Sequence, residues 1–168
     1  MKRELEEKLK KAFPYVYAGM NKVDCRWDIQ TGLSCGDGWY EIIRNASMEL
    51  EEIIQRMPEK DRKEYWACQI KEKFGGLRFY LSQSTDEMWK ITSKVEALSE
   101  YVCETCGDRG NTVKRTTIGS WLQTLCRSCR VDRKIKWFFK RLGDRWYYFR
   151  YRMKDRLLRP FKKEEDEK

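Results

Sequence analysis

Histidine is absent from the 168 residues of this chain. Its absence excludes the Ser-His and Cys-His nucleophile systems and most hydrolytic zinc sites, because each of these uses an imidazole. It also excludes the treble-clef nucleases, whose general base is a histidine. Carboxylates alone could serve a metal-dependent nuclease, but here they fall mostly on predicted helix faces, where solvated charges are common. We therefore expect a protein that is not an enzyme.

Long apolar runs are missing as well. No run of about eighteen apolar residues occurs, so no transmembrane helix is expected. The opening residues MKRELEEKLKK lack the apolar core of a secretory signal. We therefore expect the protein to act in the cytosol, where thiols are kept reduced. The seven cysteines are an odd number, which also disfavours a framework of disulfides.

Positive charge is concentrated in the last third of the chain. The formal net charge is +9, and residues 109–163 contain 18 Lys or Arg against three Asp. That segment therefore carries +15 and the remainder −6. An acidic run, EEDEK, follows it at 164–168. Such asymmetry is typical of a surface for nucleic acid or another acidic partner, although a solvated helix face would also produce it.

Apolar residues spaced three or four apart predict helices over 2–13, 38–57 and 85–102. Asp37 is a suitable N-cap for the second helix. Ser84 opens a Ser-x-x-Glu capping box, which predicts the start of the third helix. The third helix should deliver the chain directly to the first pair of cysteines.

A β-hairpin is predicted between the second and third of these helices. Apolar residues alternate with polar ones on both sides of Gly75 and Gly76, over residues 66–70 and 77–81. Alternation places one face of the hairpin in a core, and Cys68 belongs to that face. The glycine pair is not a phosphate-binding loop, because no Gly-Lys-Ser/Thr follows it.

Four cysteines form two Cys-x-x-Cys pairs, Cys103 with Cys106 and Cys126 with Cys129, separated by 19 residues. This spacing is typical of zinc sites. Two residues between ligands let a tight turn aim both sulfurs at one ion, and two such turns supply four thiolates for tetrahedral Zn²⁺. Gly107 follows the first pair, where a positive φ is often needed. Two independent redox pairs are the alternative, although no thioredoxin-like βαβ pattern surrounds them.

The order of the segments around these cysteines predicts a treble-clef finger. A knuckle is followed by β-forming residues with Gly119 as a turn, and then by two ligands at the start of a helix. A helix N-terminus favours negative thiolates. Four sulfurs leave no open position on the ion, so the zinc is expected to be structural and its binding to be coupled to folding.

Cys25 and Cys35 are candidates for half of a second metal site. Asp24, Asp28 or Asp37 would supply the remaining ligands as oxygens. A cysteine pair without histidine is also explained by two buried thiols, which pack as small apolar side chains. Both interpretations stay open at the level of sequence.

A long basic helix is predicted to begin around Cys129, with Gly143 as a point of bending and Pro160 as its limit. Its apolar residues recur at helical spacing. They are Val131, Ile135, Phe138, Leu142, Trp146, Phe149, Met153 and Leu157. The candidate partner-binding residues are Arg127, Arg130, Arg133, Lys134, Lys136, Lys140, Arg141, Arg145, Trp146 and Arg150. The aromatics could instead pack against the body, since a helix needs a buried face.

Together these elements predict an α+β fold, in which helices surround a small β-hairpin and a four-cysteine zinc finger precedes a long basic helix. We expect a body at 1–102, a finger at 103–130, a basic aromatic helix at 131–163 and an acidic tail at 164–168. The helix either packs on the body or projects from it.

Four segments of the sequence also carry a resemblance. They are CGDGWYEII (35–43), QIKEKFGGLRFYL (69–81), CETCGDRG (103–110) and WLQTLCRSC (121–129). These segments resemble those of a widespread group of small phage and prophage zinc-binding proteins, most of which have no assigned role. Some small phage zinc proteins of this general type act as anti-CRISPR inhibitors of host nucleases. The resemblance implies that the four finger cysteines are shared, and Cys35 lies within a matching segment.

We expect the protein to inhibit a host defence machine, such as an RNA-guided nuclease, by protein–protein binding in the host cytosol. The basic helix would dock on an acidic surface of that machine or on its bound RNA, with Trp and Arg as anchors. The alternative is a nucleic-acid-binding zinc-finger protein with a regulatory or accessory role. A helix lying on a membrane surface is disfavoured, because the helical spacing also suits a core. Neither a membrane nor a small-molecule substrate is therefore expected as a partner.

Overall fold

The computed structural model describes residues 1–20 and 33–162, with side chains through Trp146 in the C-terminal helix. Cys25 lies outside the described residues. The chain divides into two compact units, Met1–Arg130 and Val131–Lys168. The first unit carries both sheets, the packed helices and the two cysteine pairs, and the described part of the second is helical.

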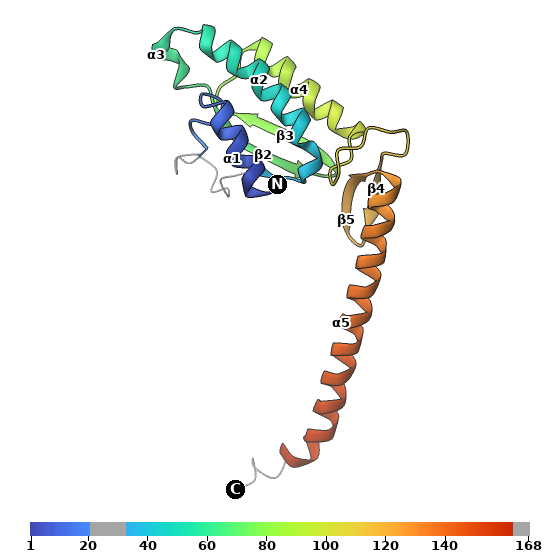
Figure 1. The fold of residues 1–168 in the computed structure, drawn as a ribbon. Coiled ribbons are helices and arrows are strands. Elements are labelled where there is room, and N and C mark those ends of the chain that lie inside the picture. The colour runs from blue at the N-terminus through green and yellow to red at the C-terminus, as the bar shows by residue number, and fades with distance from the viewer. Residues whose placement is uncertain (21–32, 163–168) are drawn as a thin grey trace. The chain divides into compact units, whose positions relative to one another are not determined.

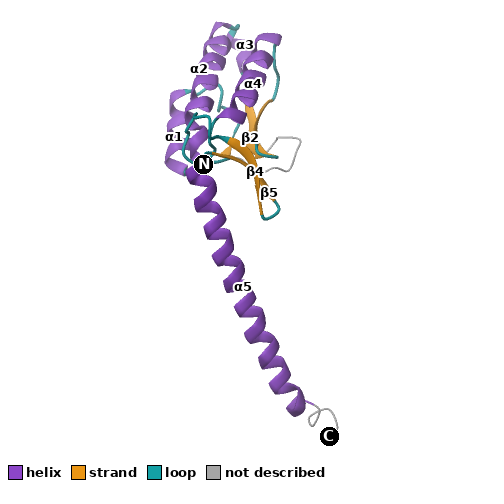
Figure 2. Cartoon of the chain, turned by 90° about the vertical axis from the view of Figure 1, so that its right-hand side faces the viewer, coloured by secondary structure: helices purple, strands orange, loops and turns teal. Residues whose placement is uncertain are grey.

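Three helices pack together along one side of the larger sheet in the first unit (Figures 1 and 2). They are α1 (Arg3–Ala12), α2 (Tyr40–Arg56) and α4 (Asp86–Leu98), and they occupy the segments in which helical spacing predicts them. Three shorter elements flank them. These are the one-turn helix α3 (Glu59–Arg62) and the 3₁₀ turns η1 (Asp37–Trp39) and η2 (Ser99–Tyr101).

The core of the first unit lies between these helices and the sheet. Trp39, Leu50, Ile70, Leu77 and Met88 are among its fully buried side chains, and they come from α2 with its preceding turn, from two strands and from α4. Ile42, Ala46, Leu50 and Ile53 recur every three or four residues along α2, as the predicted helix requires, and all four are buried. This agreement confirms the predicted phase of the helix.

A three-stranded sheet has the order β1 (Leu33–Ser34), β2 (Ala67–Lys73) and β3 (Gly76–Leu81). Strands β2 and β3 form the predicted antiparallel hairpin, and β1 pairs with β2 in parallel. The sequence does not signal β1, because two residues are too few to show alternation.

Strand β2 departs from the predicted alternation near its start. The register shifts between Ala67 and Gln69, so Ala67 and Ile70 are both buried. A bulge of this kind adds one residue to the strand, so the alternation of buried and exposed side chains is shifted by one residue. Cys68 is consequently only half-buried, which corrects the prediction that it belongs to the buried face.

The turn of this hairpin consists of Phe74 and Gly75, with φ values of 54° and 75°. Positive φ at both central residues is characteristic of a type I′ turn, which matches the twist of two antiparallel strands. Glycine adopts this conformation readily, whereas Phe74 does so at a steric cost. The Gly75 carbonyl accepts a hydrogen bond of 2.5 Å from the Thr124 hydroxyl, so the turn is held against the second hairpin.

Two helix starts differ from the predicted caps. Thr85, and not Ser84, caps α4, because its hydroxyl accepts a hydrogen bond from the Met88 amide. Asp37 lies within the 3₁₀ turn before α2, and its carboxylate accepts a bond of 2.7 Å from the Lys2 amide instead. The Asp37 contact joins segments that are far apart in the sequence, so a local pattern could not predict it.

Glu51 on α2 is the first test of this packing. Its buried carboxylate accepts hydrogen bonds from the amides of Tyr15 and Val16, at 3.2 and 2.9 Å. Glu51→Ala removes both acceptors, so we expect the free energy of unfolding to fall by about 3 kcal/mol. Chemical denaturation measures this, and the exposed neighbour Glu52→Ala should change it by less than about 0.5 kcal/mol. Equal losses in the two variants would contradict the structural role of Glu51.

The remainder of the first unit is the finger. Strands β4 (Lys114–Ile118) and β5 (Trp121–Leu125) form a second antiparallel hairpin. The finger is joined to the body by a backbone hydrogen bond as well as by the hydroxyl of Thr124. Gly38 N of the body donates to Glu104 O of the finger at 2.8 Å, and within the finger Glu104 N donates to Thr124 O at 2.9 Å. Body and finger thus form one hydrogen-bonded unit.

Helix α5 (Arg127–Lys162) begins two residues before its predicted start and continues two residues past Pro160. Its first turn belongs to the finger, and the rest forms the second unit. From Val131 to Trp146 its side chains are exposed, including those of its aromatic residues. Within the described ranges, no helix combines the length and apolarity that crossing a membrane requires.

Candidate metal centre

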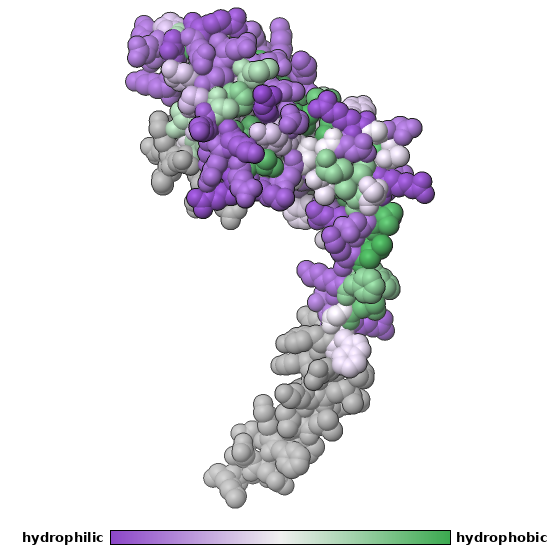
Figure 3. All heavy atoms as spheres, viewed as in Figure 1, coloured by the Kyte–Doolittle hydropathy of each residue, from purple (hydrophilic) through white to green (hydrophobic). Residues whose placement is uncertain are grey.

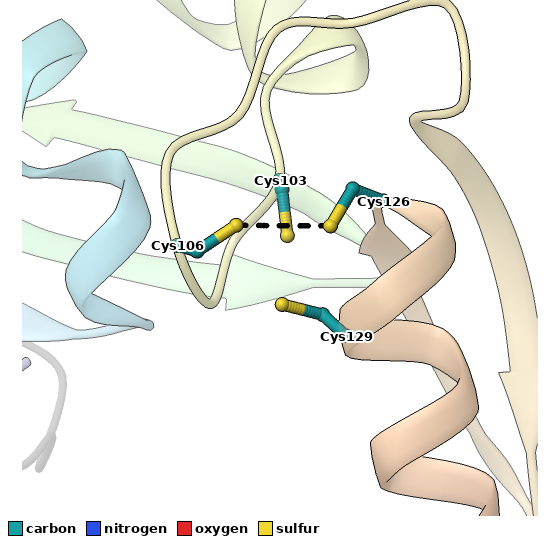
Figure 4. A group of neighbouring side chains, drawn as sticks. All are labelled: Cys103, Cys106, Cys126 and Cys129. Carbon is teal, nitrogen blue, oxygen red and sulfur yellow. Dashed lines mark hydrogen bonds between the residues drawn. The ribbon is translucent and has the colours of Figure 1, made fainter.

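The first cysteine pair is held by a tight knuckle. Cys103 N donates to Asp108 O, and Gly107 N donates to Cys103 O, both at 2.8 Å. Gly107 has a φ of 81°, which glycine adopts without the steric cost that a side chain would bring. This reversal brings Cys103 and Cys106 to the same side of the loop (Figure 4).

The second pair spans the start of α5. Cys126 directly follows β5, and Cys129 lies in the first turn of the helix. Arg130 N donates to Cys126 O at 3.0 Å, which fixes this turn. The amides at a helix N-terminus and its dipole favour negative charge, so the position suits thiolates.

The two pairs converge on one point (Figure 4). All four Sγ atoms lie within 4.8 Å of one another, and Cys106 Sγ is 3.7 Å from Cys126 Sγ. In a tetrahedral thiolate site with bonds of about 2.3 Å, neighbouring sulfurs are about 3.8 Å apart. The four cysteines could therefore hold a metal ion without a large rearrangement.

Burial is uneven around the four sulfurs. Cys103 and Cys126 are buried in a small core with Ile118 and Leu125, whereas Cys106 is exposed. This core belongs to the finger and is separate from the larger core of the body. The four sulfurs thus contribute a large part of what holds the finger together.

The surroundings of the sulfurs shift the pKa values of the thiols in opposite directions. The Ser128 hydroxyl lies 3.2 Å from Cys126 Sγ and lowers the pKa of this thiol to about 6. Burial raises the pKa of Cys129, and the sulfurs of Cys106 and Cys126 raise it further. Burial also raises the pKa of Cys106. A bound cation would displace these protons, so binding is favoured at higher pH.

Two glycines of the body support the knuckle, and sequence reasoning assigned neither of them a role. Gly36 N donates to Glu104 Oε1 at 3.0 Å, and Gly38 packs directly against the knuckle. A Cβ on Gly38 would lie 2.2 Å from Cys103 O and 2.4 Å from Gly107 N. In the sequence, the two glycines that flank Asp37 at a helix start could have indicated that another segment of backbone packs closely against this position.

Cys35, the described cysteine of the possible second site, is not one of the four clustered sulfurs. Cys35 is buried in the core of the body, where burial raises the pKa of its thiol to about 12. No group of three or more potential ligands includes Cys35 among the described residues, and Cys25 lies outside them. Arg127 is exposed in the first turn of α5, and Arg130 is half-buried.

The remaining candidate partner-binding residues fall in the second unit. Those with exposed side chains are Arg133, Lys134, Lys136, Lys140, Arg141, Arg145 and Trp146. Arg150 lies in α5 beyond the described side chains. No protein-family model, curated protein or solved structure matches the chain.

Proposed function

We propose that the four cysteines hold one structural Zn²⁺ in a treble-clef finger. Four soft sulfur ligands select zinc over the harder divalent cations, and the separation of the sulfurs suits a tetrahedron. The order of knuckle, hairpin and helix N-terminus supports the treble-clef assignment. Four sulfurs would fill the coordination sphere, so the ion would stabilise the fold and would not activate water.

The protein carrying this finger is proposed to be a non-enzymatic phage protein that inhibits a host defence machine by protein–protein binding. An RNA-guided nuclease is the proposed target, as the resemblance to small phage proteins implies. The exposed cations of α5 between Val131 and Trp146, together with the exposed Trp137, carry the binding role. Protein interfaces are enriched in Trp, Tyr and Arg, and here Arg141 lies over the Trp137 ring at 5.3 Å.

The proposed contact uses the face of α5 that carries Arg133 and Lys140. Successive helix residues turn by about 100°, so residues seven apart lie on the same side. Both side chains are exposed, and neither has an acidic partner among the ion pairs of the described residues. An acidic protein surface, or RNA bound to it, would complement this face. We call the face of α5 with Arg133 and Lys140 the far face.

Direct nucleic-acid binding is a second candidate, favoured by the density of cations along α5. Arg127 and Arg130 lie in its first turn, and six Lys or Arg follow between Val131 and Trp146. Neutralising about six to ten phosphates makes affinity fall steeply with salt concentration. A gel shift that appears at low salt and disappears at moderate salt would support this candidate.

Charge reversal on the far face tests the inhibitor proposal. In a cleavage assay with purified host defence nucleases, Arg133→Glu with Lys140→Glu should weaken inhibition by at least about tenfold, because it replaces attraction by repulsion. The matched control is Lys8→Glu with Lys11→Glu on α1, which changes the net charge equally at exposed positions and should leave inhibition unchanged. Inhibition by the far-face variant at wild-type strength would show that this surface is not the contact.

A further inference from the structure

The apolar residues of α5 form a continuous stripe. At about 100° per residue, six residues of the segment Val131–Trp146 fall within one arc of about 100°. They are Val131, Ile135, Phe138, Phe139, Leu142 and Trp146. All six are exposed, with Phe139 at 65% and Trp146 at 67%. No charged residue of this segment falls within the arc, which we call the apolar stripe.

Hydrophobic residues accordingly gather along one side of the described part of α5, with hydrophilic residues opposite them (Figure 3). The sequence continues the same helical spacing at Phe149, Met153 and Leu157. The described part of the stripe, from Val131 to Trp146, corresponds to about 22 Å of helix. A surface of this length differs from the scattered single apolar residues that proteins normally expose.

Cations border the apolar stripe on both sides. Lys134, Arg141 and Arg145 follow one edge, and Lys136 follows the other, paired with Asp132 at 2.8 Å. Between Val131 and Lys162 the sequence has twelve Lys or Arg and only three Asp. Long cationic side chains at such edges can keep their charge in water or at phosphates while their stems cover apolar surface.

The apolar stripe and the cations beside it together indicate which kind of partner could bind this side of α5. A second copy of the helix would bring two strongly cationic segments together, which opposes pairing. Nucleic acid would neutralise the cations but leave the apolar stripe in water. An anionic phospholipid surface meets both requirements, because phosphates complement the flanking cations and the acyl boundary receives Phe, Leu and Trp.

We propose that the apolar stripe of α5 docks on an anionic phospholipid membrane, with the helix lying in the plane of the surface. The expectation that no membrane is involved rested on a core that would bury these side chains, and in the described segment they are exposed. The proposal goes beyond the proposed function, since the far face with Arg133 and Lys140 lies opposite the stripe and stays turned to water. A protein partner could therefore bind while the helix is docked.

Vesicle co-sedimentation of the full-length, zinc-loaded protein tests this proposal. Vesicles of phosphatidylcholine alone are compared with vesicles of equal parts phosphatidylcholine and phosphatidylglycerol. We expect the protein to sediment with the mixed vesicles and to bind neutral ones at least about tenfold more weakly. Failure to sediment with the mixed vesicles at low salt, while RNA is still bound in a gel shift, would overturn the proposal.

Two substitutions that introduce the same charge distinguish insertion of the apolar stripe into the membrane from electrostatic attraction of the whole helix to it. Leu142→Glu places a carboxylate in the apolar stripe and should weaken vesicle binding by about tenfold or more. Trp137→Glu places one on the opposite side of the helix and should weaken it by less than about threefold. Circular dichroism confirms that both variants keep their helix content. Equal losses would overturn the proposal, because they would mean that net charge alone governs binding.

The same variants keep this proposal distinct from the inhibitor proposal. Leu142→Glu should release the protein from vesicles and leave nuclease inhibition in solution unchanged. Arg133→Glu with Lys140→Glu should have the opposite pattern, because these residues lie on the far face. Loss of vesicle binding in the far-face variant to the level of Leu142→Glu would contradict the assignment of the stripe.

Discussion

Chelation of the metal is expected to abolish the cooperative unfolding transition of the first unit at neutral pH. Structural zinc contributes on the order of 10 kcal/mol in small fingers, whereas whole domains are stable by about 5–15 kcal/mol. The finger is also joined to the body through Gly38 N, which donates to Glu104 O at 2.8 Å, and through the Thr124 hydroxyl, which donates to Gly75 O. Its loss should therefore destabilise the body as well.

Thermal denaturation followed by circular dichroism, with and without a strong chelator, measures this effect. Elemental analysis should find one zinc per chain, and adding zinc back should restore the transition. Cys103→Ser should bind no zinc, whereas Cys35→Ser should retain the full amount, because Cys35 belongs to the core of the body. An unchanged melting temperature in a chelated sample free of metal would contradict the proposed role of the four sulfurs.

Gly38→Ala is expected to disrupt the metal centre although it adds only one methyl group. The methyl would clash with backbone atoms of the knuckle, at Cys103 O and Gly107 N, and neither is the end of a flexible side chain. The knuckle would have to move, and with it two of the four sulfurs. We expect a loss of about 3 kcal/mol or more in stability and at least a tenfold loss in zinc affinity.

Competition with a chromophoric chelator gives the zinc affinity, and chemical denaturation gives the stability. Gly143→Ala is the matched control, because nothing lies within 4 Å of a Cβ at that position of α5. It should leave zinc affinity unchanged and raise helix propensity by about 1 kcal/mol. The interpretation of Gly38 fails if its alanine variant binds zinc as tightly as the wild type does.

The sequence predicts those features that depend on short-range patterns. The spacing of each cysteine pair predicts the four metal ligands. The turn at Gly107 then brings the two sulfurs of the first pair together. The phase of α2 follows from apolar residues such as Ile42 and Leu50, which recur with the period of a helix and are buried. The hairpin of β2 and β3 follows from alternation around two glycines. In each case the signal lies within a few residues of the structure that it predicts.

Features that depend on contacts between distant segments could not be predicted in this way. Strand β1 exists only because β2 lies beside it, and Gly38 is constrained by a knuckle that lies far along the chain. The bulge after Ala67 displaces Cys68 from the core without any glycine or proline to signal it.

The position of Cys126 and Cys129 has a consequence for how α5 forms. A helix is costly to nucleate, because several residues must be ordered before the first hydrogen bond compensates for them. Here the finger already fixes that first turn, with Cys129 inside it and Arg130 N bonded to Cys126 O. In the cationic segment beyond this turn, the helix needs only to be extended, one residue at a time, from a turn that is already formed. The helicity of α5 is thereby linked to whether four sulfurs are held together at its N-terminus.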